Sequence, residues 1–124
     1  MLVAIVDDDE SLLRALARLL RSSGYRAQGF ASAEAFLASP AKDDASCLLV
    51  DVNLEHASGL DLARQLSARG VRYPIIVMTG SGDEAIRKQA IELGCMYLEK
   101  PFLPDPLLAT IEDAIRTKTA FREG

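Results

Sequence analysis

The stretch CLLVDVN, residues 47–53, is an apolar run that is broken at Asp51. A run of this length without polar alternation is typical of a strand buried on both faces, as in a parallel sheet covered by helices. Ligands of open α/β sheets bind just beyond the carboxyl ends of the strands, so a carboxylate there is placed for chemistry. Asp is equally common in the turns that follow strands. The stretch by itself therefore leaves Asp51 as either a site residue or a turn residue.

The rest of the chain repeats this pattern. Four other strands are predicted, at residues 2–6, 25–30, 75–78 and 95–98. Helices are predicted before Gly24, from Ser32 as N-cap to Pro40, before Gly70, before Gly94, and from about Pro104 to Thr119. Residues 41–46 are expected to form a polar loop. Five strands that alternate with five helices predict a parallel sheet with helices on both faces, because parallel neighbours need right-handed crossover connections.

The predicted fold is an α/β, doubly wound, five-stranded parallel sheet of flavodoxin-like (βα)5 type, with the strand order 2-1-3-4-5. This order places the first and third strands side by side, about 4.8 Å apart, where the winding reverses. Asp7 and Asp8 follow the first strand and Asp51 is the first residue past the end of the third, so the three carboxylates should converge at one edge. Thr79, where the fourth strand finishes, and Lys100, in the loop after the fifth, should flank them.

Composition limits the function. The 124 residues fit a single domain, residues 1–124, and the hydrophobic and charged fractions of 49% and 26% are ordinary for a globular protein. No apolar run approaches the ~20 residues of a membrane span, and no signal peptide is evident, so we expect a cytoplasmic protein. The net charge of -4 disfavours direct nucleic-acid binding by this segment. Cys47 and Cys95 are expected to be buried thiols.

The predicted cluster has a definite chemistry. Clustered carboxylates repel one another, so they need a cation, and ligands that are all oxygen select a hard ion such as Mg²⁺. Lys100 would add a fixed positive charge, and Asp51 is then suited to be a nucleophile that forms an aspartyl phosphate. Taken singly, residues 7–9 are better explained as a helix cap, Lys100 as a solvated lysine and Thr79 as a turn hydroxyl. Their convergence at one edge favours the site.

In these features the chain resembles the receiver domains of bacterial two-component response regulators. The motifs are Asp7-Asp8, Asp51, Gly59 eight residues later, Thr79 before a small residue, and Lys100-Pro101-Phe102. The resemblance implies that a sensor histidine kinase phosphorylates Asp51, and that the protein is a signalling switch and not a turnover enzyme. It further implies that Asp8, Asp51 and the Asn53 carbonyl bind Mg²⁺ directly, and that Asp7 binds it through water. Thr79 and Lys100 would bind the phosphoryl group. Tyr97 would act as a switch whose rotamer follows Thr79.

Short sequence segments at residues 31–37, 79–83 and 99–102 resemble those of the nitrogen-fixation regulator subgroup of this chemotaxis-regulator-like fold. In that subgroup a helix-turn-helix DNA-binding domain follows the receiver, which implies control of transcription. Residues 117–124 are expected to be a tail or the start of a linker. A surface formed by the fourth helix, fifth strand and fifth helix is expected to bind a partner or a second copy of the chain after phosphorylation.

One position departs from the family pattern. Glu55 stands where a proline is usual, and it is followed by His56. Because proline fixes φ, the substitution makes the loop less rigid, and it adds a carboxylate near the metal. We expect His56 to be solvated rather than to be a ligand. The Lys100–Pro101 peptide bond is expected to be cis, as in family members that use this bond to aim the lysine.

Three alternatives are weighed against a transcriptional receiver. A stand-alone receiver would act through protein contacts alone. An Mg²⁺-dependent phosphohydrolase with an aspartyl-phosphate intermediate usually has a second Asp two residues after its nucleophile, where this chain has Asn53. A flavodoxin-like electron carrier would need a Ser, Thr and Gly-rich phosphate loop after the first strand, where three aspartates would repel the flavin phosphate.

Overall fold

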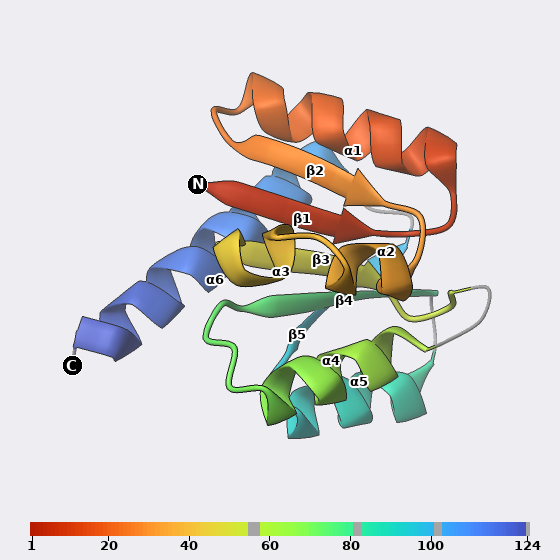
Figure 1. Cartoon of the computed structure of the whole chain (residues 1–124), viewed down its shortest axis with the longest axis vertical. Helices are drawn as coiled ribbons and strands as arrows, with labels where there is room; N and C mark the ends of the chain where they lie inside the picture. Colours follow the sequence, from red (N-terminus) through yellow and green to blue (C-terminus); the bar gives the residue numbers. More distant parts are fainter. Residues whose placement is uncertain (55–57, 81–82, 101–102, 124) are drawn as a thin grey trace.

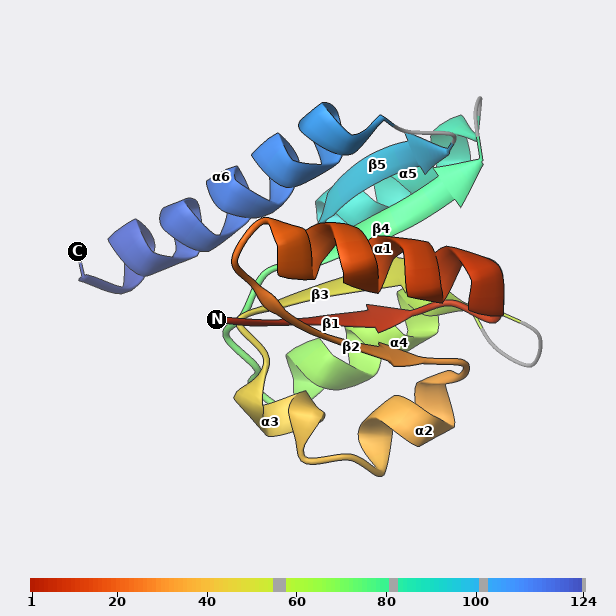
Figure 2. The same cartoon turned by 90° about the horizontal axis from the view of Figure 1, so that it is seen from above.

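The chain forms a central parallel sheet with helices on both faces. The computed structural model describes residues 1–54, 58–80, 83–100 and 103–123, with the backbone alone described for residues 118–123 (Figure 1). Helices α1 and α6 cover one face, and α2, α3, α4 and α5 cover the other (Figures 1 and 2). Each face has its own apolar core, so the buried strands between them are apolar on both sides.

The five strands are β1 (Leu2–Val6), β2 (Arg26–Phe30), β3 (Cys47–Asp51), β4 (Ile75–Gly80) and β5 (Met96–Lys100). The helices are α1 (Glu10–Ser22), α2 (Ala33–Leu37), α3 (Ala41–Asp44), α4 (Gly59–Ala68), α5 (Glu84–Glu92) and α6 (Pro104–Glu123). The strand order is β2-β1-β3-β4-β5, with every neighbouring pair parallel. The predicted fold class and strand order are therefore confirmed.

The register of the central strands decides where the acidic residues lie. All five residues of β1 and of β3 are buried. Val6 pairs with Val50, so the next step along both strands sets Asp7 beside Asp51. On the other side of β3, Asp51 pairs with Met78 of β4. Asp51 thus ends β3 with a strand on each side.

The carboxyl ends of three strands differ from the predictions. Asp51 is the last residue of β3 and does not lie past it, and β4 and β5 run two residues further than predicted, to Gly80 and Lys100. These residues are still paired: Thr79 with Glu99, and Gly80 with Lys100. Polar residues at a strand end hide its true length, because an apolar pattern marks burial and not backbone pairing.

The predicted loop at 41–46 contains the short helix α3. Pro40 at its start has φ -59° and ψ -17°, a helical conformation, and the Ala45 amide donates to the Ala41 carbonyl. Burial of Ala41 holds this single turn against the core. At the other end of the chain, α6 continues to Glu123, so residues 117–123, expected to be a tail or linker, are helical. Their role as the start of a linker stays a prediction.

The capping explanation for the three aspartates is correct for one of them. The Asp9 carboxylate accepts a hydrogen bond from the Leu12 amide, which starts α1. Asp7 instead accepts from the Asp9 amide, at 2.9 Å, which fixes its side chain at the strand end. Asp9 caps the helix, and Asp7 and Asp8 are left for the edge of the sheet. Ser32 caps α2 in the same way, as predicted.

Candidate functional site

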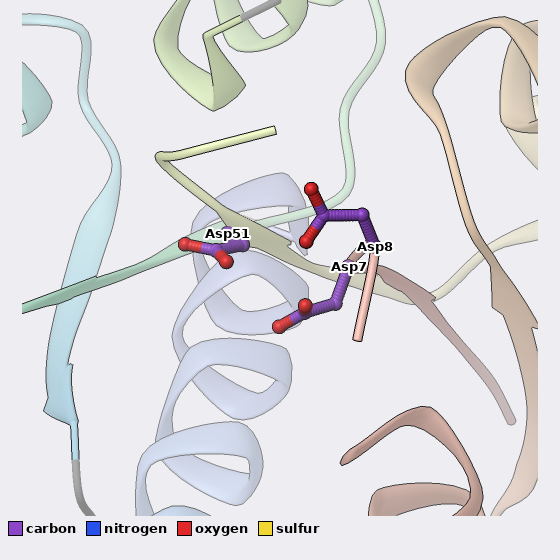
Figure 3. Close-up of side chains that lie close together, drawn as sticks. All are labelled: Asp7, Asp8 and Asp51. Carbon is purple, nitrogen blue, oxygen red and sulfur yellow. The ribbon is translucent and has the colours of Figure 1, made fainter. Parts of the chain in front are cut away.

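Asp7, Asp8 and Asp51 come together at the carboxyl ends of β1 and β3 (Figure 3). Each offers one carboxylate oxygen, and these oxygens lie within 4.8 Å of one another. Asp7 is fully buried and Asp51 is 8% exposed, whereas Asp8 is exposed. The predicted convergence is therefore present, with two carboxylates set into the sheet and a third at its surface.

Lys100 joins the two buried carboxylates. Its Nζ lies 3.0 Å from Oδ2 of Asp7 and 3.1 Å from Oδ2 of Asp51, within hydrogen-bond distance of both. It reaches them from the end of β5, although β4 lies between β5 and β3. A buried carboxylate is costly unless it is paired, so Lys100 lowers the cost of placing Asp7 and Asp51 together. The predicted position of Lys100 beside the cluster is thus observed.

The surroundings of Asp51 act on its ionisation in opposite directions. Burial raises the pKa of the Asp51 carboxyl above its ordinary value, and the charge of Asp7 adds to this. Hydrogen bonds from the Asn53 amide and from Lys100 oppose the rise without cancelling it. For Lys100, burial would lower the pKa of the ammonium, but its hydrogen bonds to both carboxylates outweigh burial and raise it. The ammonium therefore stays charged, and a further cation near Asp51 would favour the ionised carboxylate.

The start of the loop after β3 is shaped by Gly59. A Cβ at this position would lie 2.3 Å from the Asp51 carbonyl oxygen, so any side chain would displace the backbone of Asp51. The Gly59 amide donates to the Val52 carbonyl at 2.9 Å, and Asn53 and Ser58 form an isolated antiparallel bridge. Sequence reasoning identified Gly59 as part of a motif but missed this contact, which only the folded backbone reveals. It explains why the position needs glycine.

Asn53 was predicted as a metal ligand through its main-chain carbonyl. Its amide donates to Oδ1 of Asp51 at 3.1 Å, which holds the carboxylate in place. The residue is exposed and lies directly beside the acidic cluster. Its place beside the cluster agrees with the prediction, and the ligand role of the carbonyl stays a prediction.

Thr79 and Tyr97 lie on one face of the sheet beside the cluster. Thr79 is 2% exposed, and its hydroxyl donates to the Gly80 carbonyl at 3.3 Å. Within the described residues it makes no hydrogen bond to the acidic cluster. Tyr97 pairs with Val77, two residues before Thr79, so both side chains belong to the same face. Tyr97 is half-buried, and the Arg87 guanidinium lies 5.1 Å from its ring centroid.

Several predicted features fall outside the described residues. Glu55 and His56 lie in the segment 55–57, and Pro101 lies in 101–102. The effect of Glu55, the solvated state of His56 and the cis Lys100–Pro101 bond therefore stay predictions.

The donor set fits a hard divalent cation. Three carboxylates supply oxygen atoms only, and Lys100 provides a single positive charge against two buried negative ones. Oxygen donors with excess negative charge are the ligands that Mg²⁺ takes in proteins. Asp7, Asp8 and Asp51 are thus the residues that could hold the ion.

A family model of the response regulator receiver domain matches residues 3–112. The chain belongs to this family. The receiver domain is 40% identical over 123 residues to the response regulator protein TmoT of Ectopseudomonas mendocina, a match that covers 98% of this chain and 56% of TmoT. It is 39% identical to the transcriptional regulatory protein FixJ of Azorhizobium caulinodans, over 91% of this chain and 54% of FixJ. The receiver-domain family that the motifs predicted, with its resemblance to the nitrogen-fixation regulator subgroup, is therefore confirmed.

Solved structures give the same result. The crystal structure of FixJ-N matches the receiver domain with a TM-score of 0.84 at 35% identity, over 93% of both chains. Full-length FixJ from B. japonicum matches with a TM-score of 0.85 at 37% identity, over 94% of this chain and 58% of that one. The receiver domain spans about half the length of the curated relatives it matches. In the part of the chain that the structure describes, no helix is long and apolar enough to cross a membrane.

Proposed function

We propose that this receiver domain accepts a phosphoryl group on Asp51 from a sensor histidine kinase and thereby switches between two states. The observation that carries the proposal is the position of Asp51. It ends the central strand between two neighbours, beside two other carboxylates and in hydrogen-bond contact with Lys100. Membership of the receiver family supports a sensor kinase as the phosphoryl donor.

In the proposed transfer, an Asp51 carboxylate oxygen attacks the phosphorus atom of a phosphohistidine. The new O–P bond forms as the P–N bond breaks, and the electron pair of the broken bond stays on the imidazole, which takes up a proton. Slow reversal of the signal is a hydrolysis in which water attacks phosphorus, inorganic phosphate leaves and the Asp51 carboxylate is restored. Such a cycle is a timer rather than a turnover reaction on an outside substrate.

Each residue around Asp51 has a proposed task. Asp8, Asp51 and the Asn53 carbonyl would hold Mg²⁺ directly, with Asp7 acting through water. The bound ion would neutralise charge on the phosphoryl oxygens. Lys100 already contacts Asp51, so its ammonium can bind a phosphoryl oxygen with a small movement. The Thr79 hydroxyl, which now donates to a carbonyl, would turn to another phosphoryl oxygen, and the Tyr97 ring would turn inward into the space that this opens.

The proposed output is a protein-binding surface formed by α5, β5 and α6, the elements at the β5 edge of the sheet. Three exposed apolar side chains lie in or next to these elements: Ile91 of α5 is 56% exposed, Met96 of β5 37%, and Leu103, just before α6, 71%. We propose that phosphorylation makes this surface bind a partner or a second copy of the chain, and that control of transcription follows through an output domain in the full protein. The relatives named as transcriptional regulators, of which this chain spans about half, support this. A cytoplasmic location follows from the proposed kinase partner.

The decisive experiment is phosphorylation by acetyl phosphate with Mg²⁺, followed by intact mass spectrometry. The parent should gain one phosphoryl group, and Asp51→Asn, which keeps the shape but removes the nucleophile, should gain none. Chelation of Mg²⁺ should prevent labelling. Equal labelling of parent and variant would refute the assignment of Asp51.

The same samples test the enzymatic alternative. A phosphohydrolase would turn over many equivalents of a phosphomonoester such as p-nitrophenyl phosphate, whereas a receiver should release phosphate only once per labelled Asp51. Sustained turnover that depends on Asp51 would favour the phosphohydrolase.

A further inference from the structure

The contact between Arg87 and Tyr97 links α5 to the strand that carries the proposed switch. The guanidinium carbon of Arg87 lies 5.1 Å from the centre of the Tyr97 ring. This distance is within the ~6 Å at which a cation is attracted to an aromatic face. The contact joins a helix to a strand and is therefore tertiary.

Arg87 is placed by few other interactions. Its side chain is 45% exposed, and its ion partner Glu84, one turn earlier on α5, lies 3.7 Å away with 81% of its side chain exposed. An exposed pair of this kind contributes little to stability. Of the residues in α5, all of which are described, Ala90 alone is buried. Between the described residues, the Tyr97 ring is the polar or aromatic contact that joins the Arg87 side chain to an element other than α5.

We propose that Arg87 is a positioning residue that holds the Tyr97 ring in the unphosphorylated state and so limits how readily the domain switches. The proposal rests on the function proposed above, in which Tyr97 turns when Thr79 moves toward the phosphoryl group. A contact biases a switch only if it differs between the two states. When the Tyr97 ring turns, its contact with the Arg87 guanidinium is lost, so the contact favours the unphosphorylated state.

The expected size of the effect is modest and its sign is distinctive. A cation–aromatic contact at an exposed site shifts an equilibrium by about two- to fivefold. Without Arg87 the domain should bind a phosphoryl mimic about two- to fivefold more tightly. Loss of positive charge alone acts the other way, because it weakens attraction for an anion. Tighter binding in a variant that has lost a cation therefore separates the contact from general electrostatics.

Lys88 provides the matched control. It is the next residue on α5, it is exposed, and it forms no ion pair or ring contact with the described residues. Lys88→Gln removes the same charge as Arg87→Gln from a neighbouring place without touching Tyr97. Arg87→Lys keeps a cation and should retain part of the effect.

The test is carried out by NMR on protein with ¹³C-labelled tyrosine, titrated with beryllofluoride and Mg²⁺. Before titration, Arg87→Gln should move the Tyr97 ring signals toward their position in the beryllofluoride-bound parent, and Lys88→Gln should leave them in place. In the titration, the midpoint should fall about two- to fivefold for Arg87→Gln, less for Arg87→Lys, and should rise or stay for Lys88→Gln.

The two proposals fail differently. If the parent neither binds beryllofluoride nor labels on Asp51, the proposed function fails. The ring signals of the free proteins still test the contact: unchanged signals in Arg87→Gln would overturn the role of Arg87. If Arg87→Gln and Lys88→Gln give the same midpoint while the parent binds normally, the role of Arg87 is likewise refuted and the proposed function stands.

Discussion

The central strands of the sheet and its β5 edge are packed differently. On the side of β1 and β3, every strand residue is buried, and α4 buries five residues against the core. On the side of β5, no strand residue is fully buried, and α5 buries Ala90 alone. Figure 2 shows β5 at the edge of the sheet, next to β4 and beside α6. One side is a packed core and the other is a thin layer.

The site straddles this difference. Asp7 and Asp51 come from the packed strands, whereas Lys100 and Tyr97 come from β5. Regions with few buried apolar contacts open and rearrange at lower free energy than packed cores. We infer that the carboxylates are held in fixed positions, while Lys100 and Tyr97, which would respond to phosphorylation, lie where movement is less costly.

The largest expected effect compares one leucine from each side. Leu49 of β3 is fully buried and Leu98 of β5 is half-buried, and both side chains face the α1–α6 core. Leu49→Ala should lower the free energy of unfolding by about 2–5 kcal/mol. Leu98→Ala should lower it by roughly 1 kcal/mol, because less apolar surface leaves water there on folding. Urea denaturation measures both. Equal losses would show that the two sides are equally well packed.

A glycine pair gives the next largest effect. Gly59→Ala places a Cβ 2.3 Å from the Asp51 carbonyl oxygen, whereas a Cβ at Gly80 meets nothing within 4 Å. Overpacking against backbone should cost Gly59→Ala about 1–3 kcal/mol, and displacement of Asp51 should also slow its phosphorylation. Gly80→Ala should change stability by less than about 0.5 kcal/mol. Denaturation midpoints and acetyl phosphate labelling rates test this pair, and it is contradicted if Gly59→Ala behaves like Gly80→Ala.

The two buried thiols sharpen the comparison through their chemical reactivity. Burial raises the pKa of Cys47, in β3, to about 12, whereas Cys95 lies just before β5. Variants that keep one cysteine each, Cys95→Ala and Cys47→Ala, should differ in alkylation by iodoacetamide at pH 8. Cys95 should react about tenfold faster or more, because its side opens more easily. Faster alkylation of Cys47 than of Cys95 would contradict the inference that the β5 edge opens more easily than the central strands.

The same variants carry a pH dependence. The folded pKa of Cys47 lies above the unfolded value of about 8.5. Its contribution to stability is therefore complete below about pH 8.5 and is lost as the pH rises toward 12. Between these values the free energy of unfolding should fall more steeply in Cys95→Ala, which keeps Cys47, than in Cys47→Ala. Parallel pH profiles of the two variants would contradict the buried thiol.

Much of the fold was predictable from sequence. Unbroken apolar runs predicted buried parallel strands, and the predicted strand order implied that Asp7 and Asp51 lie together. Ser32 was predicted as a cap from local chemistry. Local pattern was not sufficient at the strand ends and in residues 41–44, where β4 and β5 extend through polar residues and a single helical turn is held by burial of Ala41.

The amino-acid sequence by itself determined the order of the elements and the position of the apolar part of each strand, because hydrophobic periodicity and capping chemistry act over a few residues. Only the tertiary structure decided which residues touch. Lys100 bridges Asp7 and Asp51 across β4, Gly59 packs on the Asp51 carbonyl, and the Arg87 guanidinium lies over the Tyr97 ring. Each contact joins residues from different elements, so its distance depends on strand register, helix placement and side-chain reach, which no local pattern encodes.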